Sequence, residues 1–402
     1  NTILIIPLFF INIFRKTPYK FVRIRRDTIG NGASELYLYL NIFKKRNNHL
    51  YFFDDEYVCN NCLNLIYKKN FNFSKLGLLI YNISNHIKYF ESFLLLMPNW
   101  TNLYKFNFKI KNLKTPSQYI LSKNFILQNI QQQKIFNEFS KKINLNHKTK
   151  IACLVVRDSF YKKNFSNDKK KNWNYHNYRN AKIDTYKKSI KYLIKEGYKV
   201  IKVGKGSNQK LNIKNVNYFD YSSSKYRNDF IDFYIFSRAS ICITTGTGID
   251  ELATIYKIPT VDTNFFPISE IRSCQNKNIT IFKKIWSKKL KRFLFHSELI
   301  KNKLFFYPNL LKKELMFIDN TSEEIYQATK ELNLEIKKKT PFNNKIKSNQ
   351  KKFWGIYSRS FRSKKLYKKE LLKKFEHTYK NRNIQGSMLS NYYINKNNWI
   401  LK

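Results

Sequence analysis

The sequence predicts an α/β protein with two doubly wound, mostly parallel sheets and a short tail. Three observations support this fold class. Strand and helix patterns alternate through residues 151–265, and glycine-bearing turns join a strand to a helix at residues 28–32 and 245–248. The chain of 402 residues also exceeds what one hydrophobic core usually organises, and its 43% apolar content can fill two cores.

The first expected lobe spans residues 1–148. It begins with a predicted strand, a glycine turn, a helix and a second strand, at residues 21–27, 28–32, 33–46 and 49–56. This order forms a βαβ unit, whose two strands run parallel. Residues 60–148 are rich in Asn, Lys and aromatic residues, and they predict only mixed helix and strand.

The second expected lobe spans residues 149–335, and its pattern is clearer. Strands are predicted at 151–156, 199–204, 216–221, 240–245 and 259–263, with helices at 184–196, 228–239 and 249–257. Asp184 can cap the start of the first helix and Gly197 its end, while Thr321 and Glu324 form a capping box.

Residues 336–402 are expected to hold a Lys- and Asn-rich linker over 336–352 and then a helical tail. The tail regains helical spacing at residues 366–375 and again at 387–394. We therefore expect the tail to pack on the body of the protein.

The formal net charge of +49 attracts polyanions and anionic lipids. The basic residues are spread along the chain, and no recognisable RNA-binding or zinc-finger pattern accompanies them. We attribute most of the charge to a composition rich in Lys, Asn, Ile, Tyr and Phe. No specific nucleic-acid partner is expected, and an anionic membrane surface is left open as a partner.

Cysteine usage and the N-terminal segment bear on the cellular location of the protein. The five cysteines form no disulfide framework, and the Cys59–Cys62 pair has no second pair for a zinc site, which favours a reducing, cytoplasmic location. The apolar segment 3–14 is shorter than the roughly 20 residues that span a bilayer. A more specific alternative is that this segment contacts the inner face of a membrane peripherally.

Two loops of the second lobe follow predicted parallel strands and should meet at one edge of the sheet, where ligands of such sheets bind. One begins Arg157-Asp158-Ser159, and the other is Thr245-Gly246-Thr247-Gly248. An arginine fork can hold two phosphate oxygens, and a glycine turn before a helix can expose unpaired backbone N–H groups. Together these loops predict a diphosphate site, although each alone could be a surface ion pair or an ordinary turn.

Further motifs surround these loops. Residues 153–159 (CLVVRDS), 175–186 (YHNYRNAKIDTY) and 197–204 (GYKVIKVG) come in this order, and Tyr226 to Phe230 and Ser237-Arg238 follow at matching spacing. This pattern resembles the V-R-D-S and Y-R-N-A-x-I-D-T-Y signature of a bacterial glycosyltransferase family. Residues 25–30 and 386–389 resemble that family's R-x-D-x-I-G and G-x-F-L segments. More distantly, the order is similar to fucosyltransferases of the GT-B type.

The resemblance implies a GT-B-like fold of two Rossmann-like lobes that face a cleft. It implies transfer of a sugar from a nucleoside-diphosphate sugar, with a GDP-type donor as our guess, to a glycan or lipid-linked acceptor in surface polysaccharide synthesis. Such transfer is metal-independent and inverting, and it uses no cofactor. The implied donor-binding residues are Arg157, Ser159, Arg179, Gly204, Asp229, Thr245, Gly246, Thr247 and Gly248.

The implied catalytic residues are Arg157, which would clamp the β-phosphate, and two candidate bases, Asp158 and Asp27. Gly30, Asn31 and Gly32 form the expected acceptor-side loop. The carboxylates of Asp54-Asp55 favour a solvated turn over a metal site.

Two other functions are compatible with the sequence. A non-catalytic protein that binds polyanions or membrane surfaces predicts salt-sensitive binding that survives loss of Arg157. A sugar-nucleotide epimerase predicts a product from the donor alone, without an acceptor.

Overall fold

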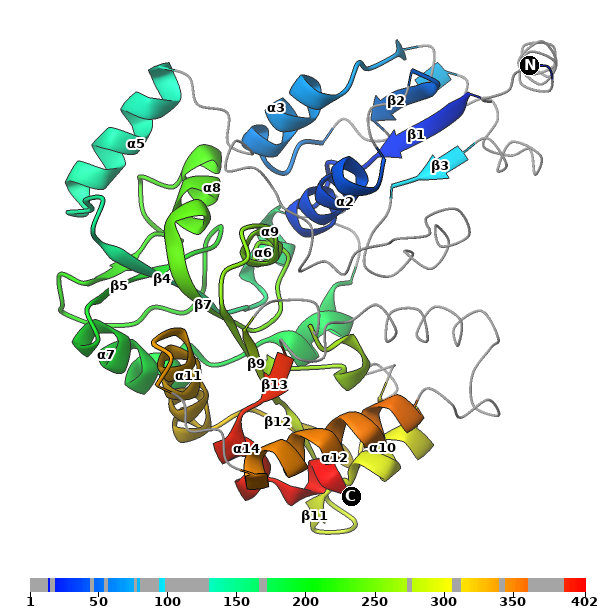
Figure 1. The fold of residues 1–402 in the computed structure, drawn as a ribbon, viewed down its shortest axis with the longest axis vertical. Coiled ribbons are helices and arrows are strands. Elements are labelled where there is room, and N and C mark those ends of the chain that lie inside the picture. Colours follow the sequence, from blue (N-terminus) through cyan, green and yellow to red (C-terminus); the bar gives the residue numbers. More distant parts are fainter. Residues whose placement is uncertain are drawn as a thin grey trace. The chain divides into compact units, whose positions relative to one another are not determined.

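The structure is a computed structural model that describes residues 14, 19–43, 47–53, 57–75, 78–79, 94–97, 130–165, 172–272, 277–305, 312–339, 344–360 and 387–402. The chain divides into two compact units (Figure 1). The smaller comprises Asn1–Lys111 with Leu121–Asn129, and the larger Asn112–Ile120 with Ile130–Lys402. Each unit holds a parallel sheet, as the sequence predicts.

The smaller unit contains a three-stranded sheet in the order β2-β1-β3, with both strand pairs parallel. Its strands are β1 (Lys20–Ile24), β2 (His49–Phe53) and β3 (Leu94–Leu96), and its helices are α2 (Ile29–Ile42) and α3 (Asn61–Asn70). The βαβ unit predicted at the start of this lobe is therefore confirmed. Cys59 and Cys62 are buried around the start of α3, which Asn60 caps by accepting a hydrogen bond from the Leu63 N–H.

Gly30, Asn31 and Gly32 do not form the predicted loop, because these residues lie in the first turns of α2. Their role on the acceptor side stays a prediction. A Cβ atom on Gly32 would stand 2.9 Å from Leu63 Cδ2. The Tyr67 hydroxyl also donates to the Gly32 carbonyl oxygen at 2.7 Å. Gly32 thus permits close approach of α2 and α3, and this helix packing replaces the turn that its glycines suggested.

The larger unit is built on a parallel sheet of seven strands in the order β13-β9-β8-β7-β4-β5-β6. From β4 the chain runs outward through β5 to β6, returns to β7 beside β4, and then runs the other way through β8 and β9. The order of the strands therefore reverses between β4 and β7. The strands are β4 (Lys150–Val155), β5 (Tyr198–Lys202), β6 (Tyr218–Asp220), β7 (Ala239–Thr244), β8 (Thr260–Phe265), β9 (Asn278–Phe282) and β13 (Ser387–Leu389).

Helices cover both faces of this sheet. Ala152 and Leu154 of β4 belong to one apolar cluster with side chains of α7 (Lys187–Lys195) and α11 (Ser322–Ile336), which pack side by side in Figure 1. The alternate β4 residues, Ile151 and Cys153, are equally buried and point the other way. That face carries α8 (Asp229–Arg238), which contacts β4, α5 (Ile130–Lys142) and α9 (Glu251–Ile255).

Two helix ends test the predicted caps. The capping box is confirmed, since Thr321 accepts from the Glu324 N–H at 3.2 Å and Glu324 accepts from the Thr321 N–H at 2.8 Å. Gly197 follows α7 with a φ of +83°. Asp184, however, is not the cap of α7. It lies in a preceding 3-10 turn, η7 (Ile183–Tyr186), and pairs with Lys187 at 2.6 Å.

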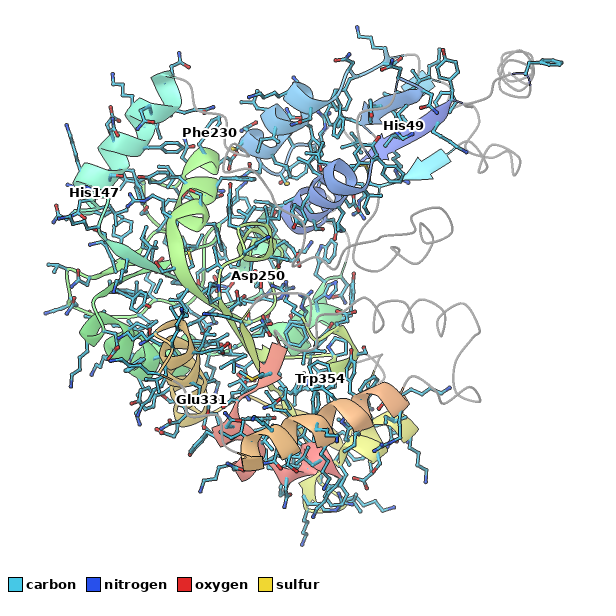
Figure 2. The ribbon with its side chains drawn as sticks, viewed as in Figure 1. His49, His147, Phe230, Asp250, Glu331 and Trp354 are labelled. Atoms are coloured by element: carbon cyan, nitrogen blue, oxygen red, sulfur yellow. The ribbon has the colours of Figure 1, made fainter. Side chains whose placement is uncertain are left out.

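The linker predicted over residues 336–352 is wrong in its second half, because helix α12 spans Asn344–Ser360. Its buried aromatic residues Phe353, Trp354 and Tyr357 lie on one helical face and anchor it to the core. The predicted helix at 366–375 lies outside the described residues. The helix predicted over 387–394 is wrong in its first part, because β13 precedes α14 (Asn391–Lys396) there and pairs with β9. Glu331, which Figure 2 labels, accepts three hydrogen bonds at the start of α14, from the Ser390 hydroxyl and from the Asn391 and Tyr392 N–H groups.

A smaller antiparallel sheet extends the larger unit. It orders β11 (Arg292–Phe293), β10 (Lys284–Ser287) and β12 (Leu315–Ile318), and α10 (His296–Lys301) follows β11. Within the part of the chain that the structure describes, no helix combines the length and the apolar character needed to cross a bilayer. Residues 3–13 and Asp54-Asp55 lie outside the described residues.

Candidate functional site

The two loops predicted to bind a diphosphate meet where the strand order reverses. The Arg157 N–H, just beyond β4, donates to the Thr245 hydroxyl at 3.0 Å. In return the Thr245 N–H donates to the Val155 carbonyl oxygen at 3.1 Å. The carboxyl ends of β4 and β7 are thus joined directly, at the position where open parallel sheets bind their ligands.

Two arginine side chains at this edge form no ion pair with a carboxylate of the described residues. The Arg157 guanidinium makes no hydrogen bond or ion pair with the described residues, and its Nε is buried. Arg179, from the 3-10 helix η6 (Asn174–Arg179), donates to the Gly246 carbonyl oxygen. Burial, followed by the charge of Arg179, lowers the pKa of Arg157 to about 10, although Asp158 and Asp250 act in the opposite direction. Both guanidinium groups stay charged at neutral pH and together favour an anion.

The glycine turn does not offer the row of unpaired N–H groups that the sequence predicts. The Thr245 N–H is used by Val155, the Gly246 N–H donates to the Thr244 hydroxyl at 3.1 Å, and the Thr247 N–H donates to Asp250 at 2.9 Å. Side chains of the turn itself thus satisfy these groups. The Thr247 hydroxyl is buried without a hydrogen-bond partner among the described residues, and it remains a candidate ligand donor.

Asp250 organises this turn, a role that we did not predict. Its carboxylate, on the residue labelled in Figure 2, accepts from the Thr244 hydroxyl at 2.5 Å and from Arg272 at 2.8 Å, in addition to the Thr247 N–H. Arg272 also pairs with Glu251 at 3.3 Å. The sequence signal was the acidic pair that follows Gly248, but Arg272 is distant along the chain and no local pattern joins it to the turn.

Comparisons with known proteins add two structural similarities. One is to the crystal structure of the glycosyl transferase family 9 from Veillonella parvula, at 11% identity and a TM-score of 0.42, covering 80% of this chain and 100% of that one. The other is to the ADP-heptose lps heptosyltransferase II of E. coli, at 13% identity and a TM-score of 0.40, covering 79% and 99%. No family model and no curated protein sequence matches the chain. Similarity at this level says nothing about substrate.

Asp158, one of the two candidate bases, has its carboxylate engaged by three donors. Oδ1 accepts from the Phe160 N–H at 2.9 Å. Oδ2 accepts from the Ser207 hydroxyl at 2.7 Å and the Asn208 N–H at 2.8 Å. These contacts tie the loop after β4 to the loop after β5, which begins near Gly204. They favour a positioning role for Asp158, and its role as a base stays a prediction.

The remaining predicted residues lie at varied places. Ser159 follows Asp158 in the same loop, and Asp229 opens α8, where it pairs with Arg227 at 3.0 Å. Asp27 belongs to the smaller unit and pairs with Arg25 at 3.2 Å. The structure therefore brings together Arg157, Arg179 and the Thr245–Thr247 turn, whereas Asp27 is described with the other unit.

Lys283 stabilises a segment next to the site, and the sequence analysis missed this residue. Its buried ammonium donates to the Asn180 carbonyl oxygen and to Asp319, both at 2.6 Å. Asn180 directly follows Arg179, so Lys283 holds the segment that carries this arginine. Burial lowers the pKa of Lys283, although Asp319 acts against this shift. Among the described residues, no group of three or more His, Cys, Asp or Glu side chains could hold a metal ion.

Proposed function

We propose that the chain is a glycosyltransferase that moves a sugar from a nucleoside-diphosphate sugar to a glycan or lipid-linked acceptor in surface polysaccharide synthesis. The observation that carries this proposal is the pair of guanidinium groups at the reversal of the sheet, of which Arg157 has no carboxylate partner. A diphosphate matches this pair in charge and in its capacity for forked hydrogen bonds.

The proposed reaction breaks the bond between the anomeric carbon and the phosphate oxygen. The electron pair of that bond stays on the departing nucleoside diphosphate, whose charge Arg157 and Arg179 stabilise together with the Thr247 hydroxyl. The acceptor oxygen bonds to the anomeric carbon on the opposite side, which inverts its configuration. Its proton passes to a carboxylate, for which Asp158 and Asp27 are the candidates. In this proposal the guanidinium groups supply the positive charge, so transfer needs no metal ion.

A thermal-shift panel tests the proposal. GDP, UDP, ADP and TDP and their sugar conjugates are added to the whole chain, and we expect GDP compounds to raise the Tm most. A ligand at about 100 times its Kd stabilises the folded state by about 2.7 kcal/mol. We expect Arg157→Ala to abolish this shift because it removes the guanidinium without a competing partner.

Arg238→Ala is the matched control. It removes the arginine that ends α8, directly before β7 and therefore at the opposite end of that strand from Thr245. The control should keep the ligand-induced shift. An equal shift in Arg157→Ala would refute the assignment of this residue, and no shift with any compound would favour a non-catalytic protein. Turnover of the donor alone into an isomer would instead indicate an epimerase.

A further inference from the structure

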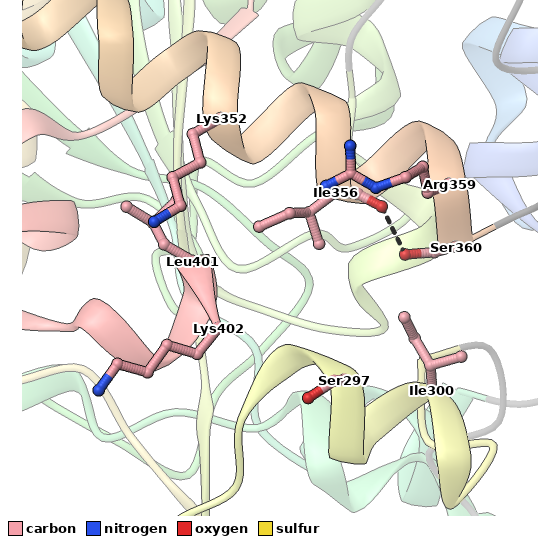
Figure 3. A pocket seen from close by; sticks show the side chains of 8 residues that line it. All are labelled: Ser297, Ile300, Lys352, Ile356, Arg359, Ser360, Leu401 and Lys402. Carbon is pink, nitrogen blue, oxygen red and sulfur yellow. Dashed lines mark hydrogen bonds between the residues drawn. The ribbon is translucent and has the colours of Figure 1, made fainter.

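A second candidate site lies on the larger unit, away from the strand ends described above. A pocket of about 550 Å³ opens between α10, α12 and the C-terminal 3-10 turn η12 (Asn398–Leu401), as Figure 3 shows. Neither Arg157 nor Arg179 lines this pocket. Its chemistry can therefore be considered independently of the proposed donor site.

Positive charge surrounds the pocket. Lys352 and Arg359 project from α12, and Lys402 lies across from them with its ammonium 5.2 Å from the centre of the Phe295 ring (Figure 3). All three side chains are exposed, and none forms an ion pair with a described carboxylate. The spacing of seven residues between Lys352 and Arg359 puts both on one helical face. The rim thus carries three cations that no described carboxylate neutralises, which favours an anionic ligand.

Aliphatic side chains give the same pocket an apolar wall. Ile356 lies between the two basic residues of α12, Ile300 comes from α10, and Leu401 comes from η12. A free anion such as phosphate would use the charged rim and leave this wall in water. A phosphate group joined to an aliphatic chain would use both, because the chain buries apolar surface while the phosphate meets the cations.

Ser360, which lines this pocket, and the buried His296 behind it could suggest a hydrolytic pair, but their hydrogen bonds exclude that role. The Ser360 hydroxyl donates to the Ile356 carbonyl oxygen at 2.8 Å. His296 Nε2, 3.1 Å from the same hydroxyl oxygen, must therefore be the donor rather than a base. Burial lowers the pKa of His296 to about 4, so its ring is neutral at neutral pH. This arrangement suits binding and not nucleophilic attack.

We propose that this pocket binds an anionic membrane phospholipid, with the phosphate on Lys352, Arg359 and Lys402 and the start of an acyl chain against Ile300, Ile356 and Leu401. The pocket thereby attaches the larger unit to an anionic bilayer. This attachment does not depend on the proposed transferase activity. A zwitterionic lipid carries both a phosphate and an acyl chain, but its quaternary ammonium is repelled by the basic rim, and free phosphate lacks the apolar part.

The test is isothermal titration of the whole chain with dihexanoyl phosphatidylglycerol below its micelle concentration. Dihexanoyl phosphatidylcholine and inorganic phosphate are the comparison ligands. We expect phosphatidylglycerol to bind at one site and more tightly than both. The double variant Lys352→Ala/Arg359→Ala should weaken this binding about thirtyfold, because two of the three cations are lost.

Lys347→Ala/Lys351→Ala is the matched control. It removes the same charge from exposed positions of the same helix that do not line the pocket. We expect it to change the affinity by less than about twofold, and circular dichroism should show both double variants folded. Equal weakening in the two double variants would overturn the proposal in favour of general charge attraction. Equal affinity for inorganic phosphate would overturn the lipid assignment, and so would the absence of saturable phosphatidylglycerol binding.

Discussion

Arg157 illustrates how a binding residue can oppose the stability of the fold that carries it. Its guanidinium is partly buried beside Arg179, and burial and this neighbouring charge lower its pKa to about 10. Between about pH 10 and the higher pKa of an arginine in the unfolded chain, the unfolded chain binds more protons at this residue than the folded protein. The contribution of Arg157 to the free energy of unfolding therefore rises with pH in this window, and below about pH 10 its charge is unfavourable. A bound diphosphate would remove that cost.

This argument predicts opposite effects of one substitution on stability and on binding. Arg157→Met keeps the apolar stem and removes the charge, so we expect the Tm at pH 7.5 to rise by about 2 °C, on the order of 1 kcal/mol. Binding of nucleoside diphosphate should be lost. In the unsubstituted protein, this binding should stay constant from pH 7 to 9 and weaken above about pH 10. Differential scanning calorimetry and titration measure these effects, and a lower Tm in Arg157→Met would indicate a structural role instead.

At this scale the sequence predicted residue types better than their contacts. Arg157 and the Thr245–Gly248 turn could be located because each directly follows a strand. The partners of the turn could not, because Arg272 reaches Asp250 only through the tertiary fold. The prediction of unpaired N–H groups was wrong for the same reason. The side chains of Thr244 and Asp250 accept hydrogen bonds from the Gly246 and Thr247 N–H groups, and spacing alone does not reveal these contacts.

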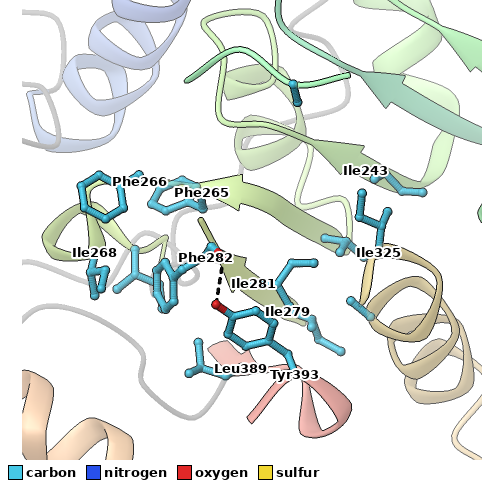
Figure 4. Close-up of a cluster of buried hydrophobic side chains, with 14 of the residues drawn as sticks. Ile243, Phe265, Phe266, Ile268, Ile279, Ile281, Phe282, Ile325, Leu389 and Tyr393 are labelled. Carbon is cyan, nitrogen blue, oxygen red and sulfur yellow. Dashed lines mark hydrogen bonds between the residues drawn. The ribbon is translucent and has the colours of Figure 1, made fainter. Parts of the chain in front are cut away.

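Among the elements, the last strand and helix show how the tail belongs to the core. β13 extends the sheet beyond β9, and α14 then places Tyr393 against β9 (Figure 4). The Tyr393 hydroxyl donates to the Phe282 carbonyl oxygen at 2.9 Å, and both groups are buried. Burial of the ring also raises the pKa of Tyr393, so the phenol keeps its proton. This bond links the C-terminal segment to the sheet.

Tyr393→Phe should therefore destabilise the larger unit without a change in shape. The substitution removes one of two donors to the Phe282 carbonyl oxygen, since Asn320 Nδ2 also donates to it at 2.8 Å. Loss of this one hydrogen bond costs about 0.5–1.5 kcal/mol. Urea unfolding followed by circular dichroism measures the loss. Tyr392→Phe is the control, because Tyr392 is the neighbouring tyrosine and its side chain is not buried in the core. If both variants unfold at the same urea concentration, the hydrogen bond contributes nothing measurable.

Element prediction succeeded where apolar periodicity was strong and failed where composition hid it. The strands from β4 to β8 fall close to their predicted positions. β4 and β7 are short apolar runs, and the alternation of strands with helices located the others. Helix α12 was missed because Lys and Asn dominate its first half, although Phe353, Trp354 and Tyr357 supply a buried face. At Gly32 the opposite error occurred. The sequence predicted a turn there, but the residue lies in a helix and allows α2 to approach α3.

The charge of the whole molecule raises a question that the site alone does not answer. The chain has 76 basic and 27 acidic residues, so any polyanion is attracted to it. Such attraction depends on the release of counterions and weakens steeply as salt rises. Binding at a partly buried arginine pair is screened much less, because salt ions do not enter between the ligand and the guanidinium groups.

Salt should therefore separate nonspecific binding from the proposed function. Between 50 and 200 mM NaCl we expect the affinity for a single-stranded RNA to fall about a thousandfold, as several phosphate contacts are lost, and the affinity for GDP to fall less than about tenfold. Arg157→Ala should abolish GDP binding and leave the RNA affinity unchanged at each salt concentration. Fluorescence anisotropy with labelled RNA and labelled GDP measures both. If the two ligands lose affinity in parallel and neither responds to Arg157→Ala, the chain is a general polyanion-binding protein, and the arginine pair at the sheet reversal has no ligand of its own.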